Sequence, residues 1–256
     1  MSRTGGGNDF ERIRKVIMQK TNYQKQLEKI LAEIKKRPEK PKLLLHACCA
    51  PCSSYVIEYL AGFFEMTILY YNPNIYPEQE YSRRLEELKQ FLPRFPPSVQ
   101  NNVHLVVQEY NPQDFYTAVR TNENPELAQE KEKGERCRRC YEFRLRRAYE
   151  YAYANNFEWF TTTLSISPFK DAEKINTIGK QLEENPGPLF LTSDFKKSSG
   201  FKRSLEISAE YGLYRQQYCG CVYSHGESHS SAHYSDVTDS KHRQTDKTKS
   251  VMTSAL

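Results

Sequence analysis

The stretch KLLLHACCAPCSSYVIEYLAGFF, residues 42–64, joins a short apolar run to a helical segment. Residues 42–46 are typical of a buried strand, and residues 53–63 fit a helix. Pro51 suits the opening turn of that helix, because its missing N–H would have no partner there in any case. Three cysteines therefore lie where a predicted strand turns into a predicted helix: Cys48, Cys49 and Cys52.

The same strand-then-helix order recurs along the chain. Further strand-like runs are expected at 66–71, 103–108, 159–164 and 189–192, and further helices at 81–91 and 138–155. This alternation predicts an α/β fold: an open, mostly parallel, Rossmann-like sheet with helices on both faces. Open parallel sheets bind ligands at the carboxyl ends of their strands, which is where the first cysteines fall.

The ends of the chain differ from this core. Residues 9–37 show helical spacing with one break, which predicts one kinked helix or two helices, ended by Pro38 and Pro41. We expect residues 1–223 to form a single α/β catalytic domain with an N-terminal helical extension. Residues 224–256 are rich in serine and histidine and poor in large apolar side chains, so they are expected to form a disordered polar tail.

Composition limits the classes of protein. The chain of 256 residues has 37 Lys and Arg against 32 Asp and Glu, a balance that permits a nucleic-acid partner without requiring one. Its mean hydropathy is -0.78, and no stretch approaches the ~20 apolar residues of a membrane-spanning helix. The polar, glycine-rich start lacks the apolar core of a secretory signal, so a cytoplasmic location is expected. Cytosolic thiols stay reduced, so the seven cysteines are expected to be metal ligands or catalytic groups.

Two cysteine clusters offer soft anionic ligands. Residues 48–52 lie at a helix start, whose partial positive charge favours thiolates. Cys137 and Cys140 form a CxxC pair at a second helix start, among several arginines that are candidate contacts for RNA phosphates or simply a solvated face. A structural zinc ion, an iron–sulfur cluster and a pair of redox dithiols all remain compatible with these clusters.

A third group is Cys219-Gly220-Cys221. Cysteines two residues apart can form a disulfide only across a sharp bend, which the glycine permits, and so small a ring is strained and readily reduced. The pair therefore suits an electron relay, with two free thiols as the alternative. His46 is interpreted as a hydrogen-bonded core histidine in preference to a sulfur contact.

These residues leave three classes of function open. The first is an iron–sulfur or redox enzyme, and the second is a zinc-stabilised RNA-binding module with no reaction of its own. The third is a nucleotide-activating, tRNA-modifying enzyme of related α/β fold. That class requires a phosphate-binding Ser-Gly-Gly-x-Asp-Ser loop after the first strand, and residues 46–52 occupy its place.

Four motifs occur together: HACCAPC at 46–52, YNPNI at 71–75, ERCRRCY at 135–141 and TTTLSISP at 161–168. In this combination the chain resembles the QueH-type epoxyqueuosine reductases of queuosine tRNA modification, from about Asn22 to Cys221. The resemblance implies a cobalamin-independent oxidoreductase that removes the epoxide oxygen of epoxyqueuosine at the wobble position of the anticodon. It also implies two partners, a tRNA with a GUN-type anticodon carrying epoxyqueuosine and an electron donor protein or reductant.

The resemblance further implies a 4Fe-4S cluster, whose ligands would be Cys48, Cys49, Cys137 and Cys140. Cys219 and Cys221 would be the redox-active disulfide pair. Adjacent side chains of an extended segment point to opposite faces, so Cys48 and Cys49 can reach one cluster only from a turn. Two residues without an assigned role are candidates to hold an additional mononuclear iron: Cys52 and Asp171.

Overall fold

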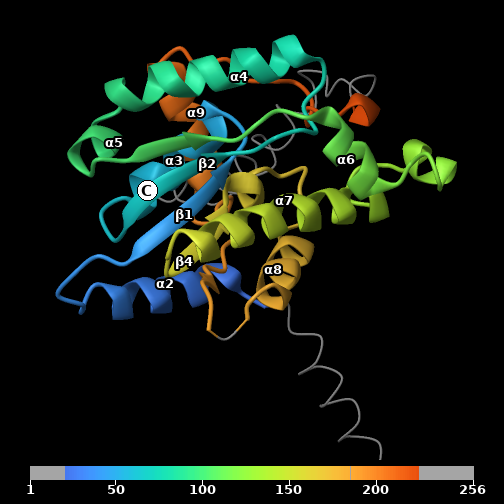
Figure 1. Ribbon diagram of the computed structural model, residues 1–256. Coiled ribbons are helices and arrows are strands. Elements are labelled where there is room, and N and C mark those ends of the chain that lie inside the picture. Colours follow the sequence, from blue (N-terminus) through green and yellow to red (C-terminus); the bar gives the residue numbers. More distant parts are fainter. Residues whose placement is uncertain (1–20, 185, 225–256) are drawn as a thin grey trace, which may run out of the picture.

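The computed structural model describes residues 21–184 and 186–224. It contains a five-stranded, all-parallel sheet with the strand order β3-β2-β1-β4-β5 (Figure 1). Its strands are β1 (Lys42–Ala47), β2 (Glu65–Tyr70), β3 (His104–Val107), β4 (Trp159–Thr162) and β5 (Leu189–Phe190). The predicted open parallel sheet is confirmed. The predictions for residues 9–20 and for the tail from 225 lie outside the described residues.

The helices are α2 (Tyr23–Ile34), α3 (Ala50–Leu60), α4 (Glu78–Phe91), α5 (Pro96–Gln100), α6 (Pro112–Val119), α7 (Glu135–Ala154), α8 (Ala172–Gln181) and α9 (Gly200–Glu210). Short 3-10 helices lie at Leu92–Arg94, Pro125–Gln129, Thr163–Ile166 and Val222–Ser224. The helices expected at 53–63, 81–91 and 138–155 are confirmed as α3, α4 and α7, whereas α5, α6 and α9 were not predicted. Among the described helices, none is both long and apolar enough to cross a membrane.

Two hydrophobic cores lie on opposite faces of the sheet. Leu43 and Leu45 of β1 pack into a core with side chains of α2, α3, α4 and α9. Leu44, between them, packs into a second core with α7 and α8. Because side chains alternate along a strand, one apolar run supplies both cores, which is typical of parallel strands buried on both faces. The helical layers are visible above and below the sheet in Figure 1.

The strand order positions the site. The chain runs outward from β1 through β2 to β3, then returns to place β4 on the other side of β1. In register, His46 of β1 lies opposite Thr162 of β4. In open α/β sheets the crevice for ligands forms at the carboxyl ends of the strands where the order reverses. Here that place lies between the ends of β1 and β4, directly before Cys48 and Thr163.

Residues 211–224, which follow α9, are fixed against the loop after β2 and against α4. The backbone N–H of Tyr76 donates to the carbonyl of Gly220 at 2.7 Å. Nη1 of Arg84, a fully buried residue of α4, donates to the carbonyl of Cys219 at 3.4 Å. Both contacts hold the backbone of the Cys-Gly-Cys segment at the carboxyl end of the sheet.

A half-buried carboxylate of α4, that of Glu87, makes this attachment sensitive to pH. Glu87 accepts the backbone N–H of Tyr214, and its second oxygen is buried without a hydrogen-bond partner among the described residues. Burial raises the pKa of Glu87 above its ordinary value. The folded protein therefore binds more protons than the unfolded chain between the two pKa values, and stability falls as pH rises through this window.

We expect Glu87→Gln to be more stable than the wild type at pH 7, because the amide keeps the acceptor for Tyr214 and removes the buried charge. The difference in free energy of unfolding should grow between pH 4 and pH 7, as measured by urea unfolding at several pH values. Glu86→Gln, on the exposed side of the same helix, is the control. Identical pH profiles for Glu87→Gln and the wild type would contradict the prediction.

Candidate metal and redox site

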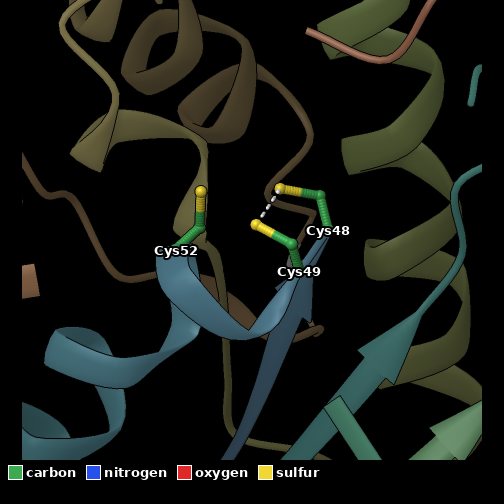
Figure 2. Close-up of side chains that lie close together, drawn as sticks. All are labelled: Cys48, Cys49 and Cys52. Atoms are coloured by element: carbon green, nitrogen blue, oxygen red, sulfur yellow. Dashed lines mark hydrogen bonds between the residues drawn. The ribbon is translucent and has the colours of Figure 1, made fainter. Parts of the chain in front are cut away.

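Cys48, Cys49 and Cys52 converge at the junction of β1 and α3. Cys48 lies at the bend after the strand, Cys49 is the N-cap of α3, and Cys52 lies in its first turn. Figure 2 shows the three side chains close together, with that of Cys48 directed at the sulfur of Cys49. All three sulfur atoms lie within 4.8 Å of one another. The sulfurs of Cys48 and Cys49 are 3.8 Å apart. The chain therefore turns at Cys48 and Cys49, so that both side chains can reach one site. The same turn places Cys52 beside them.

The three thiols of Cys48, Cys49 and Cys52 differ in pKa. Hydrogen bonds from Cys49 and Cys52, together with the charge of Arg144, hold the pKa of Cys48 well below its ordinary value. Burial, and then the neighbouring Cys48, raises the pKa of Cys49 to about 12. Contacts with Cys48 and Cys49 raise the pKa of Cys52. The first negative charge of the group thus resides on Cys48, close to the N-terminus of α3, which favours a thiolate.

The other four cysteines line a small neighbouring cavity. Cys137 and Cys140 lie at the start of α7, one helical turn apart. They share this cavity with Cys219 and Cys221, although about 80 residues separate the two pairs in the sequence. The structure thus places the CxxC pair beside the Cys-Gly-Cys pair.

A larger cavity of about 70 Å³ adjoins the first and is lined by Cys48 and Cys52. Three residues line both cavities: Cys219, Arg144 and Lys170. All three groups of cysteines therefore converge on one region at the carboxyl end of the sheet. Such a convergence suits a thiolate-ligated metal centre with a redox-active pair beside it.

Two buried cations compensate negative charge in this region. Arg144 donates through Nη2 to Oδ1 of Asn72 at 2.6 Å, and Asn72 in turn donates to the carbonyl of Ala47 at the end of β1. Lys170 is 8% exposed, and its Nζ lies 3.5 Å from Glu132. Although burial alone would lower it, the charge of nearby Cys219 raises the pKa of Lys170. Both side chains are thus held as fixed positive charges between the thiols.

Buried hydrogen-bond donors around the small cavity indicate whether a metal centre would fit there. Nε of Arg144 and the hydroxyl of Tyr141, both from residues that line the cavity, are buried without a hydrogen-bond partner among the described residues. Buried donors are rarely left unpaired, because their lost hydration is costly. An anionic group with acceptor sulfurs would satisfy them. The residues present therefore fit an iron–sulfur cluster by charge, by donor chemistry and by ligand type.

The two cysteines of the Cys-Gly-Cys segment differ in exposure and in pKa. Cys219 is partly buried and lines both cavities, whereas Cys221 is 6% exposed and lines only the small one. A hydrogen bond from Cys221, aided by the charge of Lys170, holds the pKa of Cys219 well below its ordinary value. The same hydrogen bond raises the pKa of Cys221. Cys219 is therefore the more nucleophilic sulfur of the pair.

His46 is a core histidine, as interpreted from the sequence. Its Nδ1 lies 2.8 Å from the hydroxyl of Thr162, and its Nε2 lies 3.2 Å from the carbonyl of Tyr71. A carbonyl can only accept, so Nε2 carries the proton and Nδ1 accepts from Thr162. Burial, and then the charge of Arg144, lowers the pKa of His46 to about 3, which keeps the ring neutral. The ring joins the ends of β1 and β4 beneath the cysteines.

Comparisons with known proteins identify the family of this chain. A family model described as epoxyqueuosine reductase QueH matches residues 43–227. Epoxyqueuosine reductase QueH of Staphylococcus aureus is 39% identical over 211 residues, covering 82% of this chain and 87% of that protein. The same-named protein of Streptococcus pyogenes is 38% identical and covers 80% and 78%, and that of Thermotoga maritima is 36% identical and covers 71% and 89%. The chain belongs to the QueH family.

Three further residues singled out in the sequence of this QueH chain lie apart from the three converging sulfurs: Asp171, Arg138 and Arg139. Asp171 caps α8, where its carboxylate accepts the backbone N–H groups of Glu173 and Lys174. It lines an outer groove and not the cavities that hold the cysteines. Arg138 and Arg139 form ion pairs with Glu135 on the same helix, at 2.7 and 3.0 Å. Their charge is thus partly compensated within α7.

Two residues of the candidate site, Gln216 and Lys170, were not predicted from the sequence. Nε2 of Gln216 donates to the sulfur of Cys49 at 3.1 Å, across 167 positions of sequence. Its position three residues before Cys219 was the only local signal, and glutamine beside a cysteine pair has no specific meaning without the fold. Lys170 was missed for the same reason, because it reaches the thiols from the loop before α8.

Gly220 has a backbone conformation that other residues rarely adopt. Its φ is +111°, and an added Cβ would lie 3.0 Å from Nη1 of Arg84 and 3.1 Å from Ile75. We expect Gly220→Ala to lower the free energy of unfolding by roughly 1–3 kcal/mol, because both the backbone and the neighbours must adjust. Chemical unfolding measures the loss. Gly62→Ala, where a Cβ would meet nothing within 4 Å, is the control, and equal stability of the two variants would contradict the prediction.

Proposed function

We propose that this chain is an epoxyqueuosine reductase that converts epoxyqueuosine to queuosine at the wobble position of a tRNA with a GUN-type anticodon. The observation that carries the proposal is the convergence of the cysteines at the carboxyl ends of β1 and β4. Six of the seven line two adjoining cavities, and the sulfur of the seventh, Cys49, lies beside those of Cys48 and Cys52. Membership of the QueH family supports the same activity. The reaction is proposed to proceed without cobalamin.

The proposed cofactor is a 4Fe-4S cluster held by Cys48, Cys49, Cys137 and Cys140. When bound, it would supply electrons and an iron that acts as a Lewis acid on the epoxide oxygen. The N-terminus of α3 and the cations Arg144 and Lys170 lower the cost of negative charge at this place. Cys52, whose sulfur lies beside Cys48 and Cys49, is proposed to hold an additional mononuclear iron.

The reaction balances as a two-electron deoxygenation. The epoxide takes up two electrons and two protons, both of its C–O bonds break, and the products are an alkene and water. The substrate base must leave the anticodon stack, which costs less in a loop than in a duplex. Three aromatic side chains that line the larger cavity offer surfaces for it: Phe169, Phe201 and Tyr218.

The Cys219–Cys221 pair is proposed to relay the electrons. As a dithiol it gives up two electrons and two protons and becomes a disulfide. An external two-electron reductant, such as a protein dithiol, then restores both thiols. Attack by that dithiol is directed to Cys219, since Cys219 lines the larger cavity and Cys221 is buried.

The activity is tested directly with tRNA. Iron-loaded protein and a chemical reductant are incubated anaerobically with a GUN-type tRNA that carries epoxyqueuosine, and the nucleosides are analysed by mass spectrometry. We expect epoxyqueuosine to lose one oxygen atom and to appear as queuosine. Unchanged epoxyqueuosine with fully loaded protein would refute the proposed function, and colourless protein with stoichiometric zinc would favour an RNA-binding module.

Single cysteine variants separate the cluster ligands from the additional iron. Cys137→Ala and Cys140→Ala are expected to lose most of the iron and sulfide, because each removes a proposed cluster ligand. Cys52→Ala is the matched control, expected to keep equal amounts of cluster iron and sulfide and to lose at most the additional iron. Iron and acid-labile sulfide per chain provide the measurement. The opposite pattern would assign the cluster to the group Cys48, Cys49 and Cys52.

Variants of Cys219 and Cys221 should distinguish multiple turnover, which requires the donor, from a single turnover, which does not. Cys219→Ser and Cys221→Ser are expected to reduce multiple turnover with a dithiol donor to near background, because the donor has no disulfide to attack. A single turnover by chemically pre-reduced protein should survive, and iron content should equal that of the wild type. Loss of iron from either variant would show that its sulfur is a metal ligand.

A further inference from the structure

The side chain of Gln216 connects residues 211–224 to the cysteines after β1. Its Nε2 donates to the sulfur of Cys49 at 3.1 Å and lies 4.0 Å from the sulfur of Cys52. The residues on both sides of it are anchored: Arg215 donates to the hydroxyl of Ser208 at 3.0 Å, and Tyr76 binds the carbonyl of Gly220. The amide therefore has little freedom to leave the sulfur.

The other end of this amide has no partner. Oε1 of Gln216 is buried without a hydrogen bond among the described residues. A flipped amide would direct Oε1 at the sulfur and leave Nε2 unpaired instead. With the N–H toward the sulfur of Cys49, Oε1 remains a buried acceptor without a partner among the described residues. Packing alone does not account for such a polar group, since an apolar side chain of equal size would avoid this cost.

We infer that Gln216 is a positioning residue that raises the reduction potential of the metal centre through its hydrogen bond to Cys49. The inference rests on the proposed function, in which Cys49 is a cluster ligand. An N–H donor withdraws charge from a thiolate sulfur, and it stabilises the reduced state of a cluster more than the oxidised state, because the reduced state is more negative. Removing the donor should therefore make the centre harder to reduce.

The consequence concerns the direction of electron flow. A higher potential favours entry of electrons from the Cys219–Cys221 pair and leaves less driving force for reduction of the epoxide. Gln216 and the pair belong to the same segment, three residues apart at Cys219. The segment that delivers electrons thus also adjusts how readily the centre accepts them.

The test is a redox titration of anaerobically loaded proteins, followed by visible absorption. Gln216→Leu is expected to contain as much iron and sulfide as the wild type and to show a more negative midpoint potential. Gln90→Leu removes the same carboxamide from the exposed face of α4 and should titrate like the wild type. Gln216→Asn, whose shorter side chain withdraws the donor from the sulfur, should shift the potential in the same direction as leucine.

Each outcome decides the inference. A midpoint potential unchanged in loaded Gln216→Leu and Gln216→Asn would overturn it while leaving the proposed function intact. Loss of the cluster from both variants would also overturn it, since Gln216 would then support the fold of the site and not its potential. Wild-type protein that takes up no iron and sulfide would instead refute the proposed cofactor, on which the inference depends.

Discussion

The close approach of several buried thiols is the constraint on which the rest of the site depends. Once ionised, neighbouring sulfurs repel one another, and burial makes each charge more costly. The structure limits this cost by holding the pKa of only two thiols, Cys48 and Cys219, below the ordinary value. Each of them accepts hydrogen bonds from neighbouring cysteines. Arg144 and Lys170 then lie between the two groups as buried cations. Nε of Arg144 and the hydroxyl of Tyr141 have no hydrogen-bond partner within the described part of the chain, which indicates that the region is organised for more negative charge than the thiols alone carry.

Position along the sheet is what makes this crowding feasible. The carboxyl end of β1 is adjacent to that of β4, and α3 begins within three residues of β1. Backbone N–H groups at the start of α3 lack helical partners, so the site has donors before any side chain is counted. His46 fixes the two strand ends to each other without competing for metal, because both of its nitrogens are already bonded.

Local patterns in the sequence predict much of this arrangement. The apolar run at 42–46 predicts β1, Pro51 marks the start of α3, and the helical pattern at 138–155 predicts α7. The convergence of the third cysteine group and the roles of Lys170 and Gln216 depend on contacts between residues far apart in the sequence, 38 positions for Lys170 with Glu132 and 167 for Gln216 with Cys49. No periodicity encodes such contacts. Helix α9 was missed because its apolar positions are few and its buried face consists largely of small residues, Gly200, Ser204 and Ser208.

The number of basic residues says less about where a nucleic acid could bind than the contacts that each basic side chain makes. The arginines around Cys137 and Cys140 form a dense basic group in the sequence, yet Arg138 and Arg139 share Glu135, and Arg144 is buried against Asn72. An arginine held by a carboxylate releases few counterions when a phosphate approaches, because its charge is already compensated. The net surplus of five positive charges therefore does not locate the RNA surface. What the arginines of α7 do locate is the interior of the site, where Arg144 lies among the thiols that the proposed reaction uses.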